Sequence, residues 1–344
     1  MQKQRIVWLD MAKGWGMLLI IIGHLNIQLI PQLTGVQVWI YSFHIPLFFF
    51  LSGYLFSTGK SLKEFAKKKL RTIVLPYFVF GVVILIYETY TAVRYSYFSS
   101  HWFWETVSRF LIQNRFWTIW FLAAVLVLNI MMYLMVRLLK KHWLLAVVSV
   151  VLAACAMIYY AKGGDKLPWD IDVAFAAIPY FCGGYLLRSF SEKMESILSG
   201  KLRSVIVFVV CAAVNITAAW LNYRHMKMPH DMFGMKYGIV PLAYLSGFAG
   251  IMAMIVFSHW FRLRPVQFIG ENSILYLAWH QTIVIPVVKG ILTNLHFTVD
   301  YGNPAGKILL YLLAELAMVL LIMTAVIKLI NNTKLRYLVG KKKE

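Results

Sequence analysis

The sequence contains few charged residues for its length. Only 14% of its 344 residues are Asp, Glu, Lys or Arg, whereas 60% are apolar and 16% are aromatic. A soluble domain usually carries about 25% charged residues, so this composition excludes an ordinary soluble globular protein. Long apolar runs separated by short charged loops instead indicate an integral membrane protein.

Cysteine is also scarce. The three cysteines, Cys155, Cys182 and Cys211, all fall inside long apolar runs. They have neither the number nor the spacing of a disulfide framework or a metal site, so we expect no disulfide and no metal. The first apolar run is long and lacks a small-residue cleavage site, which predicts a membrane span rather than a removable signal peptide.

The apolar runs predict the fold class. We expect an all-α integral membrane protein, a bundle of about ten transmembrane helices, which forms a single domain over residues 1–344. The expected spans are 14–33, 37–57, 72–92, 117–137, 143–161, 172–187, 204–221, 237–257, 268–288 and 307–330.

The distribution of positive charge predicts the orientation. The net charge is +20, and loops on the side of the N-terminus hold 24 of the 34 lysines and arginines. Basic loops mark the cytoplasmic side, so we predict that both termini are cytoplasmic. The basic character therefore suits a membrane and its lipids, and we expect no nucleic acid partner.

Several ionisable residues lie within the apolar runs, where each costs on the order of 2.5–3.5 kcal/mol and is a functional candidate. They are Asp10, Lys13, His24, His44, Glu88, His280 and Glu315. Lys13 and His24 are eleven residues apart, so on one helix they share a stripe and lie about 16 Å apart along it. The alternative is a snorkelling lysine and a buried structural histidine.

A second cationic candidate is the segment KSLKEFAKKKLRTIVLPY at 60–77. Lys68 and Arg71 are three residues apart and would share a helix face. This pair suits a nucleotide phosphate, although a basic loop that only sets topology and attracts anionic lipid is the simpler explanation of the segment alone.

Two predicted outer loops have unusual compositions. The loop 93–116 is rich in Tyr, Phe and Trp, which indicates either an interfacial belt or a surface on which a sugar stacks. The loop 222–236, NYRHMKMPHDMFGMK, mixes His, Asp and Lys. This second loop either contacts a polar acceptor or is simply solvated.

Taken in order, seven segments of the chain resemble the membrane-bound acyltransferase-3 family, and within it the fucose 4-O-acetylase-like O-acetyltransferases of bacteria. They are LDMAKGWGMLLIIIGH, FHIPLFFFLSGYLF, KKKLRTIVLPYF, WTIWFLAAVL, LPWDIDVAFAAIPYFCGGYLLR, YGIVPLAYLSGFAG and IGENSILYLAWH. The family's basic residue and histidine of the first span match Lys13 and His24. Its Arg-x-x-Arg pair is best matched by Lys68 and Arg71, with one guanidinium replaced by an ammonium.

The resemblance implies a ten-helix protein of the bacterial plasma membrane. It implies an O-acyltransferase that moves an acetyl group from cytosolic acetyl-CoA to a hydroxyl of a cell-surface or lipid-linked glycan. The implied catalytic residues are His24, as the general base, and His280. Lys13, Lys68 and Arg71 are the implied contacts of acetyl-CoA, and Trp120, His44 and Asp172 those of the substrate.

A different class of protein also fits the residues. A secondary transporter or polysaccharide exporter would use intramembrane His and Glu for proton coupling, and the acyl-transfer interpretation leaves Glu88 and Glu315 unexplained. Against a transporter, the chain shows no inverted repeat and no paired half-helices. Dependence on acetyl-CoA would discriminate the two.

Overall fold

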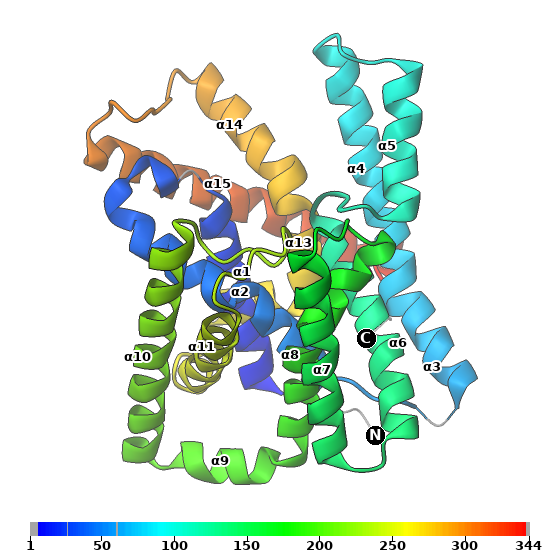
Figure 1. Ribbon diagram of the computed structural model, residues 1–344. Coiled ribbons are helices and arrows are strands. Elements are labelled where there is room, and N and C mark those ends of the chain that lie inside the picture. Colours follow the sequence, from blue (N-terminus) through cyan, green and yellow to red (C-terminus); the bar gives the residue numbers. More distant parts are fainter. Residues whose placement is uncertain (1–5, 26, 60, 342–344) are drawn as a thin grey trace. The chain divides into compact units, whose positions relative to one another are not determined.

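The computed structural model describes residues 6–25, 27–59 and 61–341, and these residues are helical almost throughout (Figure 1). The fifteen α-helices are α1 (Val7–His24), α2 (Thr34–Tyr54), α3 (Leu62–Lys69), α4 (Leu75–Arg94), α5 (Ser100–Ile112), α6 (Trp120–Leu138), α7 (His142–Ala161), α8 (Ile171–Ser189), α9 (Ser191–Ser199), α10 (Lys201–Met226), α11 (Val240–Trp260), α12 (Arg264–Glu271), α13 (Ser273–Trp279), α14 (Ile285–Asn294) and α15 (Ala305–Asn332). Short π-helices, η3 (Leu70–Val74) and η6 (His280–Val284), interrupt two of the long runs.

Within the described residues, nine helical segments are long and apolar enough to cross a membrane. The same residues contain no β-strand, and a single bridge pairs Asp231 with Lys236. The chain is therefore an all-α, multi-pass membrane protein, as predicted. α1 is not among the nine segments, because Asp10, Lys13 and His24 lower the hydropathy of its 18 residues.

The first predicted span, 14–33, was wrong in its bounds. α1 starts earlier, at Val7, and ends at His24, after which Leu25 is extended. Two 3-10 turns, η1 (Ile27–Leu29) and η2 (Pro31–Leu33), then lead into α2. Proline disfavours helical backbone in the residue before it, and Ile30 is accordingly extended. His24 therefore lies at the end of the helix rather than in its middle.

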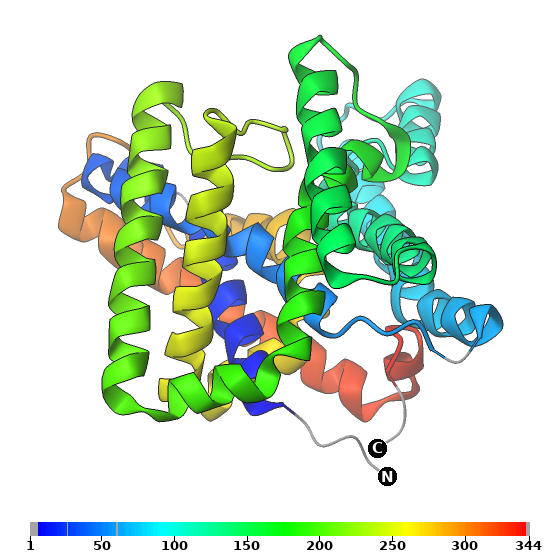
Figure 2. The ribbon, with the colours of Figure 1, turned by 60° about the horizontal axis from the view of Figure 1, so that its bottom comes forward.

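The aromatic segment 93–116 is largely a helix rather than a loop. α5 begins where the Ser99 hydroxyl accepts a hydrogen bond from the backbone N–H of Trp102, an N-cap arrangement. α5 runs back alongside α4 in both ribbon views (Figures 1 and 2). The Tyr77 hydroxyl on α4 donates to the carbonyl of Phe110 at 2.6 Å, and the Phe110 ring lies where Gly81 has no side chain.

The chain divides into two compact units. Unit 1 consists of Met1–Leu55, Pro179–Ser273 and Phe297–Leu316, and unit 2 of Phe56–Ile178, Ile274–His296 and Ala317–Glu344. Each of the helices α8 and α15 contributes one end to each unit.

Unit 1 is built on close helix contacts that small residues permit. A Cβ at Gly53 of α2 or at Gly184 of α8 would collide with the backbone of the other helix. Glycines at helix crossings allow such approach in membrane proteins. α10 and α11 lie side by side in both views (Figures 1 and 2), and the Asn215 amide on α10 donates to Ser42 Oγ and to the Ser246 carbonyl, both at 2.8 Å.

Candidate functional site

In unit 1, the predicted stripe on α1 is realised, because one uninterrupted helix carries Asp10, Lys13 and His24. Lys13 Nζ lies 3.7 Å from Asp10 Oδ1. At the other end of α1, the His24 ring hydrogen-bonds to the backbone of Ile20, four residues earlier. Because a carbonyl only accepts, the second ring nitrogen of neutral His24 carries the lone pair that a base needs.

The structure brings His44 of α2 to the end of α1 that carries His24. The Tyr41 hydroxyl donates to the Gly23 carbonyl at 3.2 Å, and the rings of Tyr41 and His44 lie 5.0 Å apart. His44 is buried, lies within electrostatic range of His24, and bonds through Nδ1 to the Ile40 carbonyl at 2.7 Å. The neutral ring of His44 therefore has Nε2 as its basic nitrogen.

The loop after α10 contributes a histidine that the sequence did not single out. His230 is only 6% exposed and lies edge-on to Tyr237, with ring centroids 4.7 Å apart. It lies within electrostatic range of His44. Neither ring nitrogen has a hydrogen-bond partner of good geometry among the described residues, although the ring lies beside the backbone of Tyr41. Burial lowers the pKa of His230 to about 4, so the ring is neutral at physiological pH.

The solvated interpretation of this loop is therefore wrong for its middle. Asn222 fastens the loop, donating from Nδ2 to the Tyr237 carbonyl at 2.9 Å and accepting at Oδ1 from the Ile239 N–H at 2.8 Å. Gly238 adopts a positive φ of 63° there, a conformation that favours glycine. His230 could have been suspected from its place in a Pro-His-Asp sequence, but its burial depends on tertiary packing.

In unit 2, the predicted phosphate-binding pair lies at the junction of α3 and η3. Lys68 ends the exposed face of α3, and Arg71 is the second residue of the π-helix; both side chains are exposed. The neighbouring Lys69 is occupied differently, because its ammonium donates to Asn129 Oδ1 at 2.5 Å and faces the rings of Phe56 and Phe65. Lys68 and Arg71 therefore remain accessible at this turn, as does Lys67.

His280 lies on the second π-helix of unit 2. Its side chain is buried, and Nδ1 bonds to the Tyr276 carbonyl at 2.7 Å, which leaves Nε2 as the basic nitrogen of the neutral ring. The Thr118 hydroxyl donates to the Ala278 carbonyl at 2.7 Å. π-helical turns are rare and concentrate at functional sites, and here the two turns hold the predicted residues Arg71 and His280.

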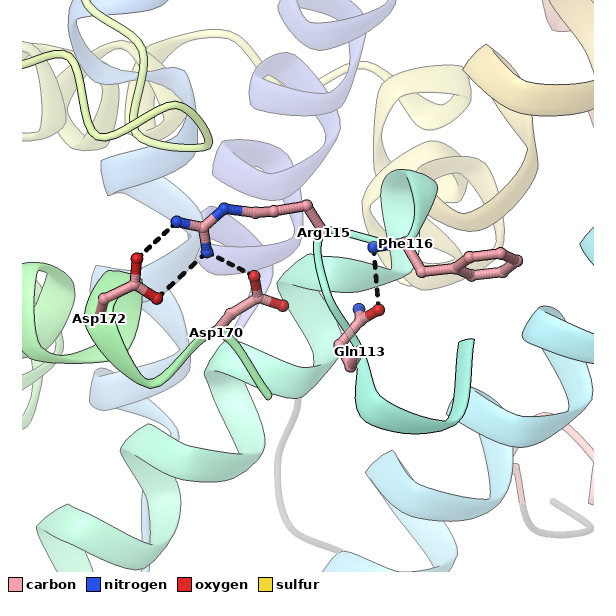
Figure 3. Close-up of polar contacts among 5 residues, drawn as sticks. All are labelled: Gln113, Arg115, Phe116, Asp170 and Asp172. Atoms are coloured by element: carbon pink, nitrogen blue, oxygen red, sulfur yellow. Dashed lines mark hydrogen bonds and ion pairs between the residues drawn. The ribbon is translucent and has the colours of Figure 1, made fainter. Parts of the chain in front are cut away.

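Asp172 does not lie in an open binding position. Arg115 Nη1 lies 2.6 Å from Asp170 Oδ1, and Arg115 Nη2 lies 2.6 Å from Asp172 Oδ2, all within the interior of unit 2 (Figure 3). Both carboxylates converge on one guanidinium, while Gln113 accepts from the Phe116 N–H at 3.0 Å (Figure 3). Sequence reasoning missed Arg115, and the aspartates of PWDID were the one available signal.

The backbone around this ion pair is unusual. Gln113, Arg115 and Trp117 have φ values of 52°, 53° and 44°, and Trp169 and Asp170 have values of 57° and 52°. A non-glycine residue in this region costs about 1–3 kcal/mol and persists only where its surroundings enforce it. The strained segment leads directly through Thr118 into Trp120, the first residue of α6, whose side chain is 8% exposed.

Comparison with known proteins identifies the family of the chain. Residues 6–327 match the family described as an acyltransferase domain, which is nearly the whole chain. The chain belongs to the acyltransferase-3 family. It is similar to the nodulation protein NolL of Sinorhizobium fredii (strain NBRC 101917 / NGR234), with 22% identity over 320 residues that cover 87% of this chain and 81% of NolL. No solved structure matches the chain.

The family match extends over both compact units of the acyltransferase. It includes all eight residues predicted from the sequence as site residues. Unit 1 carries Lys13, His24 and His44, and unit 2 carries Lys68, Arg71, Trp120, Asp172 and His280. Within unit 1, His24 and His44 come together; within unit 2, Lys68 and Arg71 share one turn, and Asp172 is taken up by Arg115.

Proposed function

We propose that the protein is a bacterial plasma-membrane O-acyltransferase that transfers an acetyl group from cytosolic acetyl-CoA to a hydroxyl of a cell-surface or lipid-linked glycan. The observation that carries the proposal is the family match over residues 6–327, which includes α1 with its ammonium and imidazole. The resemblance in sequence suggests acetyl as the transferred group and a glycan as the acceptor. The distribution of positive charge suggests that both termini are cytoplasmic.

His24 is the proposed general base. The acceptor hydroxyl gives its proton to the basic nitrogen of His24, and its oxygen attacks the thioester carbonyl. The tetrahedral intermediate collapses, the C–S bond breaks, and the CoA thiolate takes the proton back from His24. The bond from His24 to Ile20 supports this role, because it fixes the ring and leaves one nitrogen to accept the proton.

His44 is proposed to contact the acceptor beside His24. His24 and His44 come together at this end of α1, and a neutral imidazole nitrogen accepts a hydrogen bond from a hydroxyl. His280 and Trp120 remain proposed reaction and substrate contacts on the evidence of unit 2: the imidazole on a π-turn, and the indole at the start of α6. Asp172 would contact the substrate only together with Arg115, which engages both its oxygens.

Lys68 and Arg71 are the proposed contacts of the acetyl-CoA phosphates, with Lys13 as a further cation. The exposure of Lys68 and Arg71 and their position on one turn support the proposal, because guanidinium and ammonium groups bind phosphate oxygens through charge-assisted hydrogen bonds. The pairing of Lys13 with Asp10 makes Lys13 the least accessible of the three.

The position of Glu315 supports a second candidate function, that of a transporter. Its side chain is completely buried on α15, and acyl transfer gives it no role, whereas proton-coupled transporters place carboxylates in this way. The protein purified into lipid nanodiscs should release CoA from acetyl-CoA faster when acceptor glycan is added. A rate of CoA release that does not change when acceptor glycan is added, together with glycan flux into liposomes without acetyl-CoA, would favour the transporter.

A further inference from the structure

The C-terminal segment of unit 2 lies against the turn that carries Arg71. A Cβ at Gly340 would lie 2.7 Å from the Arg71 carbonyl oxygen and 3.3 Å from the Thr72 Cα. Gly340 has a positive φ of 79°, which favours a residue without a side chain. The absence of a side chain at Gly340 therefore allows the backbone that follows α15 to pack closely against η3.

This segment, residues 334–341, is here named the basic tail. It carries Lys334 and Arg336 on the short helix η7 (Lys334–Tyr337), and then Lys341. It is folded rather than extended: the Lys341 N–H donates to the Arg336 carbonyl at 3.0 Å, and Lys341 Nζ donates to Asn331 Oδ1 at 2.8 Å. Its position beside Arg71 therefore comes from a defined backbone path.

Cations outnumber acids around this turn, and the nearest acids in the sequence are Glu64 and Glu344. Residues 65–87 and 316–343 contain no Asp or Glu. Lys334 is exposed, whereas Arg336 is half-buried and its Nε has no hydrogen-bond partner among the described residues. A surface on which cations outnumber acids attracts a multiply charged anion.

We propose that the basic tail and the pair Lys68 and Arg71 form one phosphate-binding surface that takes the nucleotide end of the acyl-CoA donor. The inference rests on the proposed function and deepens it. Acyl-CoA carries a diphosphate and a 3′-phosphate, which is more negative charge than Lys68 and Arg71 alone can neutralise. Phosphate oxygens accept charge-assisted hydrogen bonds from Arg and Lys. The basic tail carries such cations, and its Gly340 lies against the backbone of Arg71.

The test compares two donors. S-acetylpantetheine has the same thioester and arm as acetyl-CoA but no nucleotide. Changing Arg336→Gln should raise KM for acetyl-CoA on the order of tenfold, and the exposed Lys334→Gln roughly threefold. Neither variant should change the rate with S-acetylpantetheine. Lys162→Gln, the same charge change on an exposed residue after α7, is the matched control and should leave both donors unaffected.

Anionic lipid shares the chemistry of the phosphates, so the assay is run in nanodiscs of phosphatidylcholine alone and with added phosphatidylglycerol. A KM effect that persists in phosphatidylcholine alone supports the donor site. An effect confined to anionic nanodiscs, an equal loss with S-acetylpantetheine, or no effect in either variant overturns it. If the wild-type protein turns over acetyl-CoA while the variants match it, the tail inference fails and the proposed function stands. If the wild type neither binds nor turns over acetyl-CoA, both fail.

Discussion

At the scale of the residue, imidazole tautomers are set by helix geometry. His44 and His280 donate from Nδ1 to the carbonyl four residues earlier, and His24 hydrogen-bonds to the backbone of Ile20, also four residues earlier. A histidine locked like this cannot rotate to exchange its nitrogens, so the basic nitrogen keeps one direction. The structure therefore identifies Nε2 as the nitrogen of His44 and His280 that can accept a proton. The sequence alone does not show this.

Lys68 and Arg71 allow a direct test of donor binding. Changing both to Ala should raise KM for acetyl-CoA at least about tenfold and change kcat much less, because the phosphates are bound equally in ground and transition states. Steady-state kinetics with varied acetyl-CoA measures both constants. The alanine variant of exposed Lys63 on α3 provides the control, and an unchanged KM in the double variant would leave the pair a role in topology only.

The burial of His230 predicts that the folded protein loses stability as the pH falls. Burial lowers its folded-state pKa to about 4, whereas an unfolded histidine titrates near 6.5. The neutral ring therefore stabilises the fold fully above about pH 6.5, and this contribution is lost as the pH falls toward 4. The groups around it are His44, Tyr41, Asp231 and Tyr237.

The measurement is the melting temperature of the detergent-purified protein between pH 7.5 and pH 4.5. His230→Gln should melt lower than wild type at pH 7.5 and lose less stability on acidification. The exposed His225→Gln, at the end of α10, should reproduce the wild-type pH profile. Parallel pH profiles for wild type and His230→Gln would contradict the buried neutral ring.

At the scale of the element, the strained segment around Arg115 is held by its ion pair. Removing one member of a buried pair leaves an uncompensated charge and costs about 3–5 kcal/mol. Arg115→Ala should therefore lower the melting temperature markedly, while Arg109→Ala, an exposed arginine at the end of α5, should change it little. Equal melting temperatures for the two variants would contradict this account, because they would show that Asp170 and Asp172 do not depend on Arg115.

The hydrogen bond from Thr118 is expected to hold the π-turn that carries His280. Thr118→Val keeps the shape but removes the hydroxyl that donates to the Ala278 carbonyl at 2.7 Å. We expect acyl transfer to fall roughly tenfold, with a melting temperature close to wild type, because one buried hydrogen bond contributes about 1 kcal/mol to stability. Thr106→Val, which removes a hydroxyl bond within α5, is the matched control; equal activity losses would point to a general effect on unit 2.

Sequence patterns predicted the helices well where hydropathy was continuous. The expected spans 143–161 and 237–257 nearly coincide with α7 and α11. The first span was misplaced because Asp10 and Lys13 made its beginning look like a loop, although they pair within the helix. The π-turns at Arg71 and His280, the partnership of Arg115 with two aspartates, and the burial of His230 all depend on tertiary packing, which no local pattern encodes.

At the scale of the whole molecule, the charge distribution predicts a definite topology. With native cysteines replaced, a cysteine at exposed Ser61 should face the cytoplasm, and one at exposed Asp165 should face outward. A membrane-impermeant maleimide should therefore label position 165 in intact cells and position 61 only after permeabilisation. The reverse pattern would place the basic loops, including Lys68 and Arg71, on the wrong side for a cytosolic donor.

The central claim is acyl transfer through His24, and its most direct test is transfer of labelled acetyl from acetyl-CoA to glycan in native membranes. His24→Ala should reduce incorporation at least about a hundredfold while binding of labelled acetyl-CoA persists. His225→Ala, on an exposed histidine, should transfer at the wild-type rate. Incorporation by His24→Ala that equals the wild type at matched protein levels would contradict the account.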